Sequence, residues 1–151
     1  MSAPTRPRAA DEAGFTLVEL LVVVLIIGVL AAVGIASFLN QRSKAQDSQA
    51  KVYATTAAKA LEVWHTDHGT YAGATSAALD AIEPSLTQAP SMTLGTLGAT
   101  TFRVAVDSIS GTSGGGTYSL ERLADGSQLR DCTNPGAGGC HSNADVNGNR
   151  W

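Results

Sequence analysis

The chain contains an uninterrupted apolar run near its amino terminus that is long enough to cross a bilayer. Between Leu20 and Leu39 the only polar side chain is Ser37. About 20 residues at ~1.5 Å each in a helix match the ~30 Å hydrocarbon core of a membrane. One carboxylate, Glu19, lies at the start of this run. Because an unpaired carboxylate at membrane depth is costly, Glu19 is a candidate functional residue that requires a partner.

The sequence on either side of the run does not read as an ordinary secretory signal. A short polar segment, residues 1–14, precedes it, and no small-residue cleavage pattern follows Leu39. Positive charges flank the run on both sides: Arg6, Arg8, Arg42, Lys44 and Lys51. Counting these charges leaves the orientation open. The composition of the carboxy-terminal half and its cysteines favour an extracytoplasmic soluble part.

The hexapeptide Gly14-Phe15-Thr16-Leu17-Val18-Glu19, followed by the apolar run, resembles the class III leader junction of type IV pilins and type II secretion pseudopilins. The resemblance implies that a membrane prepilin peptidase cuts between Gly14 and Phe15 and that the new amino terminus of Phe15 is N-methylated. It also implies that Phe15 and Glu19 act in assembly, with Glu19 pairing with the terminal amine of a neighbouring copy. The residues alone also permit pairing with the chain's own amine, or a simple anchor that tolerates one interfacial carboxylate.

One position departs from the family pattern. Many type IV pilins have a proline partway along the apolar run, and this chain has Ala36 there, with Gly28 and Gly34 as the nearest weak points. The absence of the proline favours a smoother helix.

The helix is predicted to continue beyond the membrane run. No proline occurs between Phe15 and His68, and Gly69 is placed to end the helix with a left-handed cap. Small and apolar residues recur at three- and four-residue steps at Ala50, Ala54, Ala57, Leu61 and Trp64. Such a stripe predicts that the outer half of a helix of about fifty residues packs on another layer.

That layer is predicted to be an antiparallel sheet. Residues 101–107 alternate apolar and polar side chains, residues 117–123 form a second candidate strand, and Asp125-Gly126 signals a hairpin into residues 127–131. A short helix is expected over Ser76 to Ile82. The predicted fold is α+β and type IV pilin-like: a long amino-terminal helix, transmembrane in its first half, packed on a small antiparallel β-sheet.

The predicted organisation has six segments. They are a cleaved leader (1–14), the transmembrane and assembly half of the helix (15–39), its soluble half (40–68), an αβ-loop (69–99), the sheet (100–131) and a carboxy-terminal loop with a disulfide (132–151).

The two cysteines, Cys132 and Cys140, lie close together in the Gly-rich tail. A disulfide between them closes a short loop that an entropy model values at roughly 2.5 kcal/mol, and it resembles the stapled carboxy-terminal loop of many type IV pilins. A reactive or metal-binding cysteine pair is the alternative.

Four other patterns are weak indications of a catalytic, metal-binding or DNA-binding site. Residues 111–115 satisfy G-x-S-x-G but lack the strand–turn–helix context of a hydrolase. Asp145 and Asn147, with Asp131, are weak candidates for a calcium site. His65, Asp67 and His68 are a weaker metal alternative. Four arginines could gather to hold DNA: Arg103, Arg122, Arg130 and Arg150. The net charge of -3 gives no default expectation of nucleic-acid binding.

The sequence therefore predicts a structural pilin with no enzymatic activity and no cofactor. It would span the inner or cytoplasmic membrane once and then join an extracellular pilus filament made of copies of itself. The expected partners are the prepilin peptidase, the pilus assembly platform and its motor. The alternatives are a type II secretion pseudopilin and a minor pilin that binds DNA or a surface ligand. Filaments of this kind serve twitching motility, cell adhesion, DNA uptake or secretion, and the sequence does not choose among these roles, because they depend on motors and partners encoded elsewhere.

Overall fold

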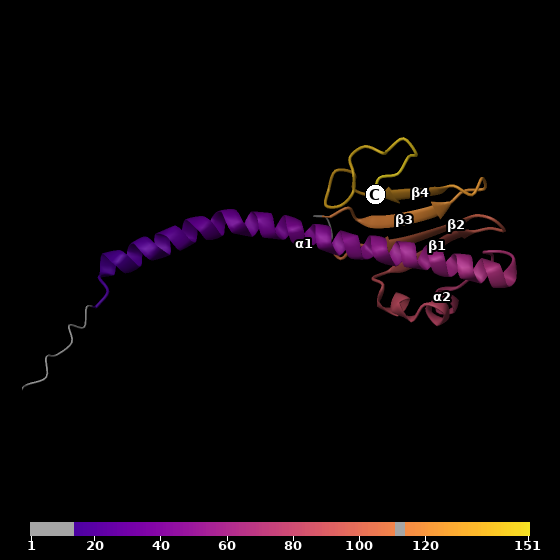
Figure 1. Ribbon diagram of the computed structural model, residues 1–151, viewed down its shortest axis with the longest axis horizontal. Helices are drawn as coiled ribbons and strands as arrows, with labels where there is room; N and C mark the ends of the chain where they lie inside the picture. Colours follow the sequence, from indigo (N-terminus) through magenta and orange to yellow (C-terminus); the bar gives the residue numbers. More distant parts are fainter. Residues whose placement is uncertain (1–13, 111–113) are drawn as a thin grey trace, which may run out of the picture. The chain divides into compact units, whose positions relative to one another are not determined.

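The computed structural model describes residues 14–110 and 114–151 (Figure 1). Its elements, in chain order, are α1 (Leu17–His68), α2 (Ser76–Ile82), the 3-10 helix η1 (Pro84–Gln88), β1 (Met92–Leu97), β2 (Phe102–Asp107), β3 (Thr117–Arg122) and β4 (Gln128–Cys132). The chain divides into two compact units, with the boundary between Ser37 and Phe38. Unit 1 therefore contains the amino-terminal part of α1, and unit 2 contains the rest of α1 and all the other elements.

The sheet of unit 2 is a simple antiparallel meander. Its strands follow one another in the order β1-β2-β3-β4, and the β2–β3 pair is in register from Phe102↔Arg122 to Asp107↔Thr117. Alternate residues of β2 are buried, namely Phe102, Val104 and Val106. This period of two confirms the strand predicted over residues 101–107 and gives the sheet one core face.

The prediction that residues 69–99 form an αβ-loop did not include the strand β1, which lies within them. Gly95 lies within this strand, and the register of the strand with β2 shifts between Leu94 and Leu97. The irregularity hides the alternation that identifies a strand in a sequence. The short helix predicted over Ser76 to Ile82 is confirmed as α2, which Thr75 caps by accepting a hydrogen bond from the Ala78 N–H.

The part of α1 in unit 2 packs on the sheet through a stripe of small side chains. One row of buried positions recurs at alternating steps of four and three residues, which places it on one face of the helix. It consists of Ser43, Asp47, Ala50, Ala54, Ala57 and Leu61, and Ala58 and Ala60 beside it are buried as well. The predicted stripe is thus confirmed at Ala50, Ala54, Ala57 and Leu61, and its last member, Trp64, is half-buried against the same core. Alanines at its centre let the helix backbone lie close to Val106 and Tyr118 of the sheet.

A buried carboxylate, Asp47, fastens α1 to two loops that are distant in sequence. Its side chain is 0% exposed. The Ser110 hydroxyl donates to Oδ1 at 2.7 Å, and the N–H groups of Gly115 and Gly139 donate to Oδ2 at 2.9 and 2.7 Å. Burial by itself raises the pKa of Asp47, but the hydrogen bonds from Ser108, Ser110, Gly115 and Gly139 outweigh it and hold the pKa below its usual value.

The loops around Asp47 require glycine. Gly138 has φ +54°, and a Cβ there would overlap Asp47 Oδ2. A Cβ on Gly115 would overlap the hydroxyl of Tyr118. The Gly-rich segments of the sequence are therefore the parts of the chain that wrap a carboxylate with backbone N–H groups.

Next to Asp47, Lys51 lies one helical turn further along α1. Its Nζ donates to the Gly139 carbonyl at 2.6 Å and lies 5.2 Å from the ring centroid of Tyr118. Burial lowers the pKa of Lys51, and the Asp47 carboxylate opposes that shift. Burial also raises the pKa of Tyr118, and Asp47 raises it further.

A second polar cluster fixes the other end of unit 2. The Tyr71 hydroxyl donates to Glu62 at 2.7 Å, and Arg122 forms an ion pair with the other oxygen of Glu62 at 2.8 Å. Burial, followed by the interaction with Glu62, raises the pKa of Tyr71 to about 12. Helix α1 ends at His68, and Gly69 has φ +70°. The predicted left-handed cap is therefore confirmed, and Tyr71 packs back on His65 and Phe102.

Replacing Asp47 with alanine is expected to destabilise unit 2 by about 2–4 kcal/mol, because two backbone N–H groups and a hydroxyl lose their acceptor in a buried site. Asp47→Asn is the matched control. Its amide oxygen can accept from Gly115 and Gly139, so the loss should be smaller. Thermal unfolding of the full chain in detergent, monitored by near-UV circular dichroism, measures the loss of stability in Asp47→Ala and in Asp47→Asn. Equal stability of Asp47→Ala and the unsubstituted chain would contradict this role.

The Asp47 interaction is also expected to depend on pH. Its pKa in the folded chain is lower than in the unfolded chain, so its contribution is fully present above the unfolded pKa of about 4 and is lost as pH falls through the folded value. The stability difference between the unsubstituted chain and Asp47→Asn should therefore be constant above about pH 5 and shrink below about pH 4. Melting curves across this range measure it, and a difference that grows on acidification would refute the assignment.

Candidate processing and assembly site

The predicted processing junction lies at the amino-terminal end of α1. Helix α1 begins at Leu17, and the hydroxyl oxygen of the preceding Thr16 accepts a hydrogen bond from the N–H of Glu19 at 3.2 Å. Thr16 is therefore the N-cap, and Thr16-Leu17-Val18-Glu19 has the T-x-x-E spacing of a capping box. The carboxylate of Glu19 lies in the first turn, where the helix dipole favours a negative charge. The cap at Thr16 was not predicted from the sequence, although the three-residue spacing from Thr16 to Glu19 is the signal of a capping box.

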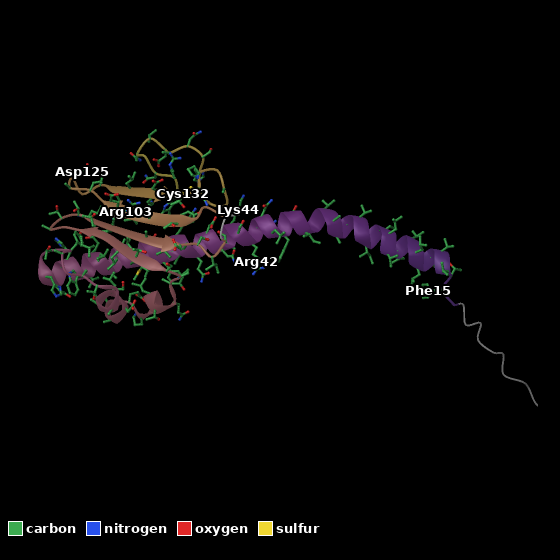
Figure 2. The ribbon with its side chains drawn as sticks, turned by 180° about the vertical axis from the view of Figure 1, so that it is seen from behind. Phe15, Arg42, Lys44, Arg103, Asp125 and Cys132 are labelled. Carbon is green, nitrogen blue, oxygen red and sulfur yellow. A yellow bond between two sulfur atoms is a disulfide. The ribbon has the colours of Figure 1, made fainter. Side chains whose placement is uncertain are left out.

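Gly14 and Phe15 precede the helix and are exposed. Figure 2 shows Phe15 at the amino-terminal end of α1. A Cβ built on Gly14 meets nothing within 4 Å. Phe15 is 85% exposed, so it packs on no part of the described chain. Nothing in the fold of the described residues therefore requires a glycine at this position or an aromatic residue after it.

The part of α1 that follows the junction is apolar on all sides and has no cover. Every described side chain from Leu17 to Arg42 is exposed. By length and composition, α1 qualifies as a membrane-spanning helix. It is helical without interruption through Gly28, Gly34 and Ala36, the position where many type IV pilins have proline. An apolar surface of this extent requires lipid or other apolar helices around it.

The predicted disulfide between Cys132 and Cys140 is confirmed, with a Cα–Cα distance of 5.9 Å. Both cysteines are buried and pack with Ala50, Ala54 and Tyr118. The loop that they close supplies Gly138 and Gly139 to the Asp47 carboxylate. The disulfide thus holds in place the loop that binds the helix, a connection that the spacing of the cysteines did not reveal.

The weak calcium candidates form a self-contained turn. Asp145 Oδ1 accepts the N–H groups of Asn147 and Asn149 at 2.8 Å each, and Oδ2 accepts the Asn149 side-chain amide at 3.2 Å. Asp131 instead pairs with Arg150 at 3.2 Å. These contacts use the carboxylate of Asp145 to shape the tail, so it acts as a turn-forming residue in the described structure.

The other metal and catalytic candidates gain no support. His68 stacks on Trp64 with ring centroids 3.6 Å apart, and His65 lies against Tyr71. Within residues 14–110 and 114–151, no group of three or more His, Cys, Asp or Glu side chains could hold a metal ion. The candidate hydrolase serine, Ser113, lies outside the described residues.

The four arginines considered for DNA binding have different contacts. Arg122 pairs with Glu62 and Arg150 pairs with Asp131. Arg103 is exposed on the outer face of the sheet, whereas Arg130 lies 5.6 Å from the ring of Trp151 and accepts a hydrogen bond from the Arg150 N–H at its backbone carbonyl. Two of the four guanidinium groups are therefore engaged in ion pairs within the described chain.

Comparison with known proteins agrees with the junction and the helix. Residues 10–35 match the family described as "Prokaryotic N-terminal methylation motif". The chain is 43% identical over 58 residues to the type IV wide pilus major component PilA4 of Thermus thermophilus, a match that covers 38% of this chain and 44% of the relative. It is 36% identical over 62 residues to a fimbrial protein of Neisseria meningitidis, covering 41% of this chain and 36% of the relative.

A third relative, the type IV major pilin protein PilA of Myxococcus xanthus, is 50% identical over 38 residues, which is 25% of this chain and 17% of the relative. All three matches cover less than half of the relative's length. The similarity is to pilus and fimbrial proteins, which confirms the resemblance predicted from the hexapeptide and the apolar run. Residues 10–35 of this chain carry the prokaryotic N-terminal methylation motif, and the chain is similar to type IV pilus proteins over its amino-terminal part.

Proposed function

We propose that this chain is the structural subunit of a type IV pilus or a pilus-like filament. The observation that carries the proposal is the apolar surface of α1 in unit 1, which is exposed on all sides and lies largely within the residues that match the methylation motif. Before assembly the bilayer covers this surface, and in the filament the same helices of neighbouring copies cover it. Because both settings are apolar, the transfer between them costs little free energy.

Processing is part of this proposal. Cleavage between Gly14 and Phe15 by a prepilin peptidase would create a terminal amine two residues before the first residue of α1, and N-methylation would follow at Phe15. A glycine that meets no neighbouring atoms is consistent with a requirement set by a peptidase and not by the fold. The assembly platform and motor of the filament would act on the processed subunit.

Glu19 would supply the specific contact in an otherwise apolar helix bundle. Its carboxylate is exposed and lies four residues after Phe15. In an apolar bundle a carboxylate is stable when it meets a positive group, and the terminal amine of a neighbouring copy is a cation at similar depth. Similarity to a type IV pilus component and to a fimbrial protein favours a pilus subunit over a secretion pseudopilin. The extracellular location of the filament belongs to the same proposal.

The decisive experiment is mass spectrometry of filaments sheared from the surface of the producing cells. The proposal expects abundant chains that begin at Phe15, carry one added methyl group there and retain the disulfide. Sheared filaments that contain none of this chain would overturn the proposal.

Replacing Glu19 with glutamine is expected to allow membrane insertion and to abolish filaments. Glutamine preserves the size and helix propensity of the side chain but cannot pair with an amine through charge. Electron microscopy of the cell surface and the amount of chain in the membrane fraction measure the two effects. Glu19→Asp is the control that retains the charge. Normal filaments from Glu19→Gln would exclude the proposed pairing.

Replacing Gly14 with valine is expected to leave the chain at its uncleaved length in the membrane. A branched side chain would enter the scissile junction, while a Cβ at this position meets no atom of the described residues within 4 Å. Intact mass measurement of the membrane-extracted chain detects the retained segment. Gly28→Val is a matched control, because a Cβ at Gly28 also meets nothing within 4 Å. Normal cleavage of Gly14→Val would contradict the assignment of the junction.

A further inference from the structure

Unit 2 carries opposite charges at its two ends. Arg42 and Lys44, which we name the basic end, are exposed on the first turns of α1 in this unit. Asp67 in the last turn of α1 and Asp125 in the β3–β4 turn, which we name the acidic end, are exposed as well. Figure 2 shows Arg42 and Lys44 at one end of this unit and Asp125 at the other.

These charges are not neutralised within the described part of the chain. The two ion pairs found there, Arg122–Glu62 and Arg150–Asp131, involve none of the four residues. Hydrogen bonds from the Ser127 hydroxyl and N–H hold the pKa of Asp125 below its usual value, so Asp125 is ionised at neutral pH. One acid, Asp107 at the carboxyl end of β2, lies toward the basic end. It alternates with buried residues and so faces away from α1, and its carboxylate accepts a hydrogen bond from the Thr117 hydroxyl.

The two ends are too far apart to act on each other. Twenty-five residues of α1 separate Arg42 from Asp67, which is about 38 Å at ~1.5 Å per residue. The Debye length at physiological ionic strength is ~8 Å, so each end retains its own field. The carboxy-terminal end of α1 adds a negative partial charge to the acidic end.

We propose that the acidic end of unit 2 in one copy of this chain contacts the basic end of unit 2 in another copy. The proposal rests on the proposed function, since it names the second contact by which filament subunits recognise one another. The two contacting surfaces are different and do not overlap. A contact of this heterologous kind repeats from copy to copy without closing, which is the geometry that an open filament requires.

Charge complementarity selects a second copy as the partner. In a filament each unit 2 is held beside others at a high effective concentration, so a few exposed ion pairs suffice to orient it. Such pairs contribute mainly to orientation and register, while the apolar helices supply most of the affinity. A contact between like ends would place equal charges together and is disfavoured.

The test uses two charge variants of the full chain in the producing cells. In the first, Arg42→Glu with Lys44→Glu makes both ends acidic. In the second, Asp67→Lys with Asp125→Asn makes both ends basic, and asparagine at 125 retains an oxygen for the Ser127 turn. We expect each variant alone to lose filament yield by about tenfold or more, because like charges then meet at every contact. Expressed together in one cell, the two variants should form filaments that contain both chains.

The matched control is Lys59→Glu, which changes the net charge by half as much as the first variant. Lys59 is exposed on α1 and lies between the two ends, 15 residues after Lys44 and eight before Asp67. This control should assemble normally. Membrane abundance and an intact disulfide, read from electrophoretic mobility without reductant, show that each variant inserts and folds.

Three outcomes would overturn the proposal. They are a normal filament yield from either variant alone, an equal loss of filament yield in the control, and failure of the two co-expressed variants to form filaments. These outcomes are separate from failure of the proposed function. If the unsubstituted chain forms filaments that depend on Glu19 and the charge variants also form them, the pilin assignment stands and only the contact between ends is refuted.

Discussion

The fold of unit 2 depends on one buried carboxylate. Asp47 is the point at which α1, the loop between β2 and β3 and the disulfide loop meet, and all of its hydrogen bonds come from the two loops. An isolated buried carboxylate is strongly unfavourable, so the chain can bury Asp47 only when both loops have closed around it. The helix, the sheet and the tail must therefore form together. The disulfide assists because it limits the conformations of the loop that supplies Gly138 and Gly139.

The stripe of alanines in α1 follows from the same requirement. Backbone N–H groups reach Asp47 only if the loops approach the helix surface closely, and large side chains at Ala50 or Ala54 would hold the sheet away. Most of the apolar volume is supplied instead by the sheet and the αβ segment, through Phe102, Tyr118 and Tyr71. The small helix face and the large sheet face are therefore complementary. Neither would bury its apolar surface well without the other.

The sequence was sufficient for features that depend on local patterns. The helix and its end at Gly69, the strands β2 and β3, the β3–β4 hairpin, the cysteine pair and the hexapeptide of the methylation motif all have signals within a few neighbouring residues. Strand β1 was missed because Gly95 and a register shift remove its alternation. Asp47 was missed for a different reason. In the sequence it is one polar residue on a polar part of a helix, and its partners are glycine N–H groups 68 and 92 residues away, which have no side chains to mark them.

The contrast between the two units bears on how filament subunits would find their register. In unit 2 the buried stripe on α1 repeats at steps of three and four residues, so one face and one axial position fit the sheet. In unit 1 the helix is apolar on every side, and apolar surfaces pack with similar free energy at many axial offsets, since their attraction is non-directional. A single carboxylate changes this, because every offset that leaves it unpaired in an apolar bundle is penalised. Glu19 would therefore select one offset among many, as a buried polar residue does in a coiled coil.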